Sequence, residues 1–186
     1  MYTSSDFRRG LPILVDGEPY YVVSYLHIKM GRGGANVRTR LKHIVTGAVI
    51  EKVFSPDESF KPPDLERRKM QYMYENSGEL AFMDAQTYEQ LSIPEDDLGD
   101  AKWYLLENEE YTVLFLNNKA ISVDLPASVV LEVVETEPAV RGDTVSNVTK
   151  PAKLQTGLEV KVPLFVKQGD RLKIDTRSGE YLERAG

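Results

Sequence analysis

Alternation of apolar and polar side chains dominates this sequence and predicts short β-strands. Residues 20–29 are rich in β-branched and aromatic side chains, as strands are. In residues 35–44, Val37, Thr39 and Leu41 fall on one face of a strand. Many short strands at close spacing are typical of small barrels, so we expect an all-β fold.

Clusters of turn-forming residues separate these strands and predict hairpins. Gly, Asn and Ser gather at residues 30–34, 76–78, 117–119 and 177–179, and we expect a turn at each. Only residues 84–91 have a helical pattern, which predicts one short helix.

Two proline-containing joints divide the chain. Residues 61–64, Lys-Pro-Pro-Asp, break helix and strand because proline lacks an N–H donor and restrains the residue before it. Residues 125–127, Leu-Pro-Ala, do so more weakly. We therefore expect domains at residues 1–63, 64–127 and 128–186.

Charge is distributed unevenly among these segments. The chain of 186 residues has a net charge of −6. Residues 1–63 carry 9 Lys and Arg against 6 Asp and Glu, a net +3. Residues 64–127 carry 5 against 14, a net −9, and residues 128–186 carry 9 of each. This asymmetry suggests that the first segment meets a polyanion and that the middle one stays away from it.

Composition narrows the class of protein further. Hydrophobic residues make up 41% and charged residues 28%, as in soluble globular proteins. The absence of cysteine excludes disulfide scaffolds and thiolate metal sites. The first ten residues lack the apolar core of a signal peptide, and no apolar run approaches the roughly 20 residues that span a bilayer. We expect a cytoplasmic protein that does not bind a membrane.

Enzyme motifs are scarce, and we expect no catalytic residue, cofactor or metal. His27 and His43 lie in the two strands of one predicted hairpin. An imidazole pair for metal or acid–base chemistry is one interpretation. The preferred interpretation is that both are ordinary strand residues, because no carboxylate or Cys ligand is set beside them.

The acidic residues 95–100 do not have calcium-loop spacing and predict a solvated loop. Residues 141–143, Arg-Gly-Asp, match a cell-adhesion tripeptide. Cell adhesion needs an extracellular setting, which nothing in the sequence indicates.

The first hairpin has the best candidate binding surface. Strand alternation places a polar row on one face, with two further cations at the adjoining tip: Asn36, Arg38, Arg40 and Lys42, then Lys29 and Arg32. Such a row suits the phosphates of folded RNA, although a solvated sheet face explains it equally well. The glycines around Arg32 favour RNA binding, because they let the backbone approach another surface and carry a long side chain outward.

Three stretches together carry a resemblance to a known family. They are the tip at residues 29–35 with the strand at 37–42, the Arg-Gly-Asp-Thr at 141–144, and the long segment 150–184. Along essentially its full length, the chain resembles translation elongation factor P of bacteria. The resemblance implies an SH3-like, KOW-type barrel followed by two OB-fold barrels, arranged as an L.

The resemblance also implies a function without enzymatic chemistry. The factor would bind the 70S ribosome between the P and E sites and contact rRNA and the peptidyl-tRNA. It would promote peptide-bond formation at consecutive prolines by positioning the CCA end of that tRNA.

Residue roles follow from the same resemblance. Arg32 would face the peptidyl-transferase centre and carry a rhamnose added by an arginine rhamnosyltransferase. The loop with Gly142, Asp143 and Thr144 would lie near mRNA in the E site. We expect a monomer whose ribosome-binding residues are Lys29, Gly31, Arg32, Gly33, Arg38, Arg40, Lys42, Gly142, Asp143 and Thr144.

Other functions stay open at this point. A general RNA-binding OB-fold protein would need a stacking platform, and Tyr72, Tyr74 and Phe82 fit either that role or a core. A carbohydrate- or peptide-binding module is favoured by the fold alone. An elongation-factor-P-like paralogue also bears Arg at its tip, but residues 142–144 and 175–179 favour the main family.

Overall fold

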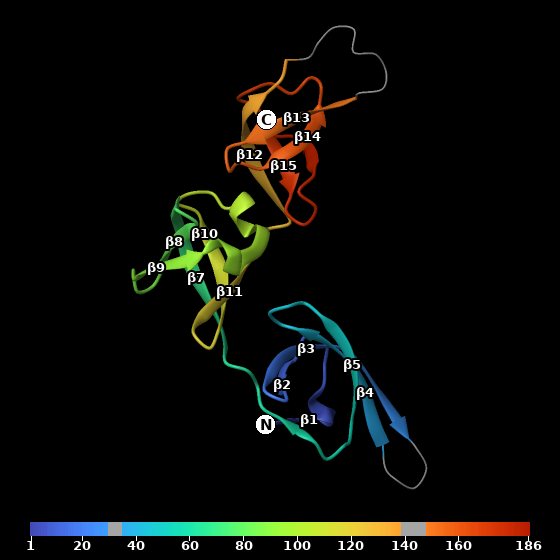
Figure 1. The fold of residues 1–186 in the computed structure, drawn as a ribbon. Coiled ribbons are helices and arrows are strands. Elements are labelled where there is room, and N and C mark those ends of the chain that lie inside the picture. The colour runs from blue at the N-terminus through green and yellow to red at the C-terminus, as the bar shows by residue number, and fades with distance from the viewer. Residues whose placement is uncertain (30–34, 139–147) are drawn as a thin grey trace. The chain divides into compact units, whose positions relative to one another are not determined.

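The computed structural model describes residues 1–29, 35–138 and 148–186. Strands dominate it, and the helical elements in these ranges are short and of the 3-10 type (Figure 1). The chain forms two compact units, one of residues 1–66 with 116–119 and one of residues 67–115 with 120–186. No helix in the described ranges has the length and apolar character needed to cross a membrane. The all-β prediction is confirmed.

The first unit contains a four-stranded antiparallel sheet in the order β2-β3-β4-β5 and a two-stranded sheet of β1 and β6. Its core includes three phenylalanines, and the ring centroids of Phe54 and Phe60 lie 4.7 Å apart in an edge-to-face contact. Phe7 packs on both. The elements of this unit are β1 Tyr2–Thr3, η1 Ser4–Asp6, β2 Pro12–Val15, β3 Glu18–Lys29, β4 Ala35–His43, β5 Val49–Phe54 and β6 Ser59–Phe60.

A five-stranded sheet in the order β11-β10-β7-β8-β9 follows. Two predicted hairpin turns are confirmed, at Ser77–Gly78 and Asn117–Asn118. All four residues have φ between 50° and 82°, the left-handed region that two-residue hairpin turns require. The elements are β7 Leu65–Asn76, β8 Glu79–Asp84, β9 Gln90–Pro94, η3 Glu95–Trp103, β10 Glu110–Leu116 and β11 Lys119–Asp124.

The helix predicted at residues 84–91 is wrong. The Asp84 carboxylate accepts the backbone N–H groups of Gln86 at 2.8 Å and Thr87 at 3.1 Å, which folds a tight turn instead. These two hydrogen bonds also lower the pKa of Asp84.

The acidic run at residues 95–100 is not the predicted loop, because it lies in η3. Leu98 and Ala101 of η3 are buried in the core of the adjoining sheet. Gly99, with φ of 60°, interrupts the helical geometry. Burial of one face therefore folds a segment whose charges alone predict a solvated loop.

The last sheet has the order β14-β13-β12-β15-β16. Its core also holds Tyr104, and Trp103 packs against that core. The Thr156 hydroxyl donates a hydrogen bond of 2.7 Å to the Trp103 carbonyl. The domain boundaries expected after residues 63 and 127 stay a prediction. The strands are β12 Ser128–Thr136, β13 Thr149–Leu154, β14 Glu159–Pro163, β15 Arg171–Asp175 and β16 Tyr181–Arg184.

Candidate nucleic-acid interface

Strand β4 has one buried face and one charged face. Val37, Thr39 and Leu41 are almost fully buried in the first unit. The Thr39 hydroxyl is satisfied there, since it donates a hydrogen bond of 2.7 Å to the Lys52 carbonyl. This packing fixes the register of β4, so the alternate residues must point outward.

The outward residues Arg38, Arg40 and Lys42 are exposed. None of them forms an ion pair with a carboxylate in the part of the chain that the structure describes. Lys52 differs, because its ammonium lies 2.9 Å from the Asp16 carboxylate. The Asp16 hydrogen bond also raises the pKa of Lys52. The outward row of β4 therefore keeps its positive charge available to a partner.

Aliphatic side chains lie beside Arg38 and Lys42 of this cationic row, whereas Arg40 is paired with Glu51 of β5. Arg38 lies between Leu26 of β3 and Val53 of β5, and Lys42 is paired with Val49 of β5. These three aliphatic side chains are exposed. The face can thus combine attraction for phosphate with apolar contact, as interfaces with folded RNA do.

The strands of this hairpin carry the chain toward the predicted tip. Lys29 ends β3, is exposed and pairs with Ala35 at the start of β4. The tip residues Gly31, Arg32 and Gly33 lie outside the described residues, as do Gly142, Asp143 and Thr144 of the other predicted loop. The structure therefore brings Lys29 onto the same hairpin as the cationic row, and every predicted binding role stays a prediction.

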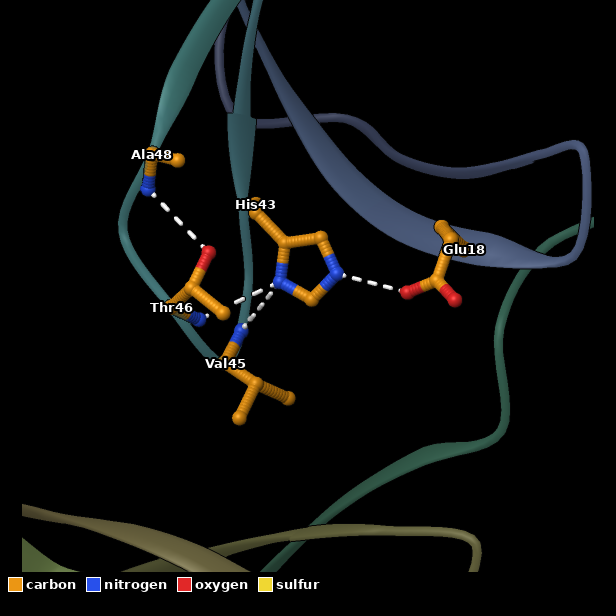
Figure 2. A network of polar contacts seen from close by, with 5 residues as sticks. All are labelled: Glu18, His43, Val45, Thr46 and Ala48. Atoms are coloured by element: carbon orange, nitrogen blue, oxygen red, sulfur yellow. Dashed lines mark hydrogen bonds and ion pairs between the residues drawn. The ribbon is translucent and has the colours of Figure 1, made fainter.

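His43 supports the turn between β4 and β5 (Figure 2). The backbone N–H groups of Val45 and Thr46 each donate to its Nδ1 at 3.1 Å. Its Nε2 lies 2.8 Å from a carboxylate oxygen of Glu18. The expectation that no carboxylate lies beside the histidines is therefore wrong for His43. Antiparallel pairing places Glu18 there, 25 residues away in sequence.

The two histidines do not form one site. His27 is exposed, packs its ring edge-on against Tyr25 and is paired with Val37. His43 lies six residues further along β4, which is about 20 Å at the rise of a strand. Within the described ranges, no group of three or more His, Cys, Asp or Glu side chains is placed to hold a metal ion.

Tyr72, Tyr74 and Phe82 do not form the aromatic stacking platform that a general RNA-binding protein would need. Tyr72 and Phe82 are buried in the core of the middle sheet, with ring centroids 5.4 Å apart. Tyr74 is the exposed member of the three. One exposed ring does not make a surface on which successive bases stack.

Comparison with known families covers nearly the whole chain. Residues 3–60 match the family model "Elongation factor P (EF-P) KOW-like domain", residues 65–123 match "Elongation factor P (EF-P) OB domain", and residues 129–184 match "Elongation factor P, C-terminal". The KOW-like and OB expectations for the fold are confirmed by these matches.

Individual relatives agree with the family models. An elongation factor P of Nitratidesulfovibrio vulgaris is 52% identical over 99% of this chain and 100% of its own length. Another, of Thermoanaerobacter sp., is 53% identical over 99% and 100%. A solved structure of a eukaryotic translation initiation factor 5A from Methanococcus jannaschii aligns with a TM-score of 0.56 at 22% identity, over 66% of this chain and 90% of its own, and supports the fold alone. The chain therefore belongs to the elongation factor P family of bacterial translation elongation factors, which are not enzymes.

Proposed function

We propose that this translation factor binds the 70S ribosome between the P and E sites and promotes peptide-bond formation at consecutive prolines. The proline ring restricts the backbone and hinders approach of the reacting atoms. A factor that orients the CCA end of the peptidyl-tRNA contributes through positioning and needs no acid or base of its own. A barrier lower by about 1.4 kcal/mol makes the reaction roughly tenfold faster, so a modest gain in orientation relieves a stall.

The observation that carries this proposal is the unpaired cationic row on β4. Burial of the alternate residues of β4 directs three cations outward: Arg38, Arg40 and Lys42. None of them forms an ion pair with a carboxylate in the described ranges. The row lies on the strand that follows the tip, in the segment of net charge +3. Phosphates of rRNA and of the peptidyl-tRNA are the partners that suit such a surface.

Arg32 is the proposed working residue at the tip. A guanidinium stays charged and offers five donors, which suits phosphates and base edges. In this proposal Gly31 and Gly33 let the backbone approach the CCA end closely, and Lys29 adds a second cation. A rhamnose attached to Arg32 by an arginine rhamnosyltransferase would lengthen the side chain and add hydroxyl contacts. Peptide mass spectra of protein from its native host test this, and an unmodified Arg32 in fully active protein would leave the bare guanidinium as the working group.

The remaining assignments complete the proposal. Gly142, Asp143 and Thr144 contact mRNA in the E site, and the factor acts as a cytoplasmic monomer. Support comes from the match of residues 129–184 to the C-terminal family model, a region that includes this loop.

Sedimentation with 70S ribosomes over a range of salt concentrations tests the binding surface. Reversing Arg38 and Arg40 to Glu should weaken binding and flatten its salt dependence, by roughly one unit of logarithmic slope for each phosphate that is no longer neutralised. The matched control reverses Lys69 and Lys119, two exposed cations of the acidic segment, and should leave binding nearly unchanged. Equal binding by both double variants would show that the β4 row does not contact the ribosome.

A further inference from the structure

A pocket of about 640 Å³ opens in the second unit. Strand β7 lines it with Tyr72 and Glu75, and η3 lines it with Lys102 and Trp103. Glu107 and Glu109 follow η3 and complete an acidic wall. The volume is in the range of pockets that hold small organic molecules.

Tyr72 brings to this pocket a hydroxyl for which the structure gives no protein partner in the described ranges. Its side chain is only 7% exposed, and its hydroxyl makes no hydrogen bond to any residue in the described ranges. No described polar side-chain atom is both sealed from solvent and unpartnered, so solvent reaches this hydroxyl, and Tyr72 lines the pocket. A hydroxyl in such a place can both donate to and accept from a ligand that enters the pocket.

The carboxylates around Tyr72 are not neutralised from within the structure. Glu75, Glu107 and Glu109 form no ion pair with a described residue. Glu75 and Glu107 line the pocket together with Tyr72. Burial raises the pKa of Tyr72 to about 12, and the charges of Glu107 and Glu75 act in the same direction. The surrounding segment, residues 64–127, has a net charge of −9 and attracts cations.

The indole ring of Trp103, which lines the pocket, already contacts one cation, the ammonium of Lys102. The Lys102 ammonium lies 4.7 Å from the centroid of the Trp103 ring and 3.2 Å from a Glu95 oxygen. The Thr156 hydroxyl anchors the backbone of Trp103 by donating a hydrogen bond of 2.7 Å to its carbonyl. The pocket thus combines an indole ring with three carboxylates, Glu75, Glu107 and Glu109, that form no ion pair with a described residue, while its fourth carboxylate, Glu95, is paired with Lys102.

We propose that this pocket binds a linear polyamine. Ammonium groups would pair with Glu75, Glu107 and Glu109 and donate to the Tyr72 hydroxyl, while the methylene chain would pack on the indole of Trp103. A bare metal ion fits poorly, because no described trio of carboxylate and imidazole side chains converges closely enough to hold one. This ligand class goes beyond the proposed action at the tip and does not depend on it.

Titration of the full chain with spermidine tests the proposal. Trp103 is the only tryptophan, so its fluorescence reports on this pocket alone. We expect a saturable change with one site, and calorimetry should give the same affinity. Glu75→Gln and Glu107→Gln should each weaken binding by about tenfold, since each removes one charge-assisted hydrogen bond. Tyr72→Phe should weaken it by a smaller factor.

Matched controls separate a built site from general attraction to an acidic surface. Glu89→Gln makes the same change in charge at an exposed position of the same segment and should leave the affinity unchanged. An uncharged diol of similar length should not bind, and Mg²⁺ should not reproduce the fluorescence change. Thermal unfolding shows whether each variant is folded. If a variant does not fold, the comparison of spermidine, the diol and Mg²⁺ on the unaltered chain still tests the proposal.

Three results would overturn the polyamine proposal. The first is the absence of saturable spermidine binding at low salt. The second is an equal loss of affinity in Glu89→Gln and Glu107→Gln, which would indicate charge without a site. The third is much tighter binding of a trilysine peptide than of spermidine, which would assign the pocket to a basic protein segment.

Discussion

The Glu18 carboxylate lies 2.8 Å from Nε2 of His43, on the opposite side of the ring from the two backbone N–H groups at Nδ1 (Figure 2). Nδ1 accepts two backbone N–H groups, so it cannot itself hold a hydrogen. Nε2 therefore carries the hydrogen and donates a hydrogen bond to the Glu18 carboxylate. This pairing links the first residue of β3 to the last residue of β4 and supports the turn that follows.

The tautomer of His43 is directly measurable. Nitrogen NMR at neutral pH should show a protonated Nε2 and an unprotonated Nδ1 for His43. His43→Ala should lower the free energy of unfolding by about 1–3 kcal/mol, because it removes the acceptor of two backbone N–H groups. His27→Ala, at an exposed position, should change it by about 0.5 kcal/mol or less. Both variants should still support elongation, and loss of activity in a folded, ribosome-bound variant would point to chemistry that we have not assigned.

Alkaline pH should destabilise the second unit through Tyr72. Burial raises the pKa of this phenol from 10.0 to about 12, so the folded state binds its proton more tightly than the unfolded state does. The stabilisation is fully present below pH 10.0 and is lost as the pH rises to about 12. Chemical unfolding measured across this range should show falling stability, and the fall should be smaller in Tyr72→Phe. An unchanged pH profile in that variant would assign the effect to other groups.

Gly157 should tolerate a methyl group poorly. A Cβ added there would lie 3.2 Å from Cζ3 of Trp103, and the residue has φ of 92°. Gly169 is the matched control, because its φ is 93° and nothing lies within 4 Å of its added Cβ. Both alanine variants should incur backbone strain of about 1 kcal/mol, and Gly157→Ala should lose more stability and alter Trp103 fluorescence. Equal losses would show that the indole moves aside freely.

Local patterns in the sequence predict much of the fold. The alternation of β4 predicts both the burial of Leu41 and the exposure of Arg40, because strand geometry alone sets which face each residue takes. The turn at Ser77–Gly78 follows from residue types that adopt positive φ. These features depend on neighbours along the chain.

Features that depend on distant residues could not be predicted in this way. The pairing of Glu18 with His43 arises from the register of β3 and β4, and the local sequence around neither residue predicts it. The helix η3 forms because Leu98 is buried by another element, whereas local propensity favoured residues 84–91. The pocket at Tyr72 needs β7 and η3 brought together, which no spacing in the sequence indicates.

Peptide-bond formation on ribosomes stalled at Pro-Pro-Pro is the most direct test of the role assigned to Arg32. The native factor should relieve the stall, while Arg32→Ala and Arg32→Lys should lose most of this activity and still sediment with ribosomes. Lysine keeps the charge but lacks the guanidinium that the proposed glycosyltransferase would modify. Lys69→Ala, a change to an exposed cation elsewhere, should rescue as well as the native factor does. Full rescue by Arg32→Ala would contradict the account, because the tip of the first hairpin would then not be the working end.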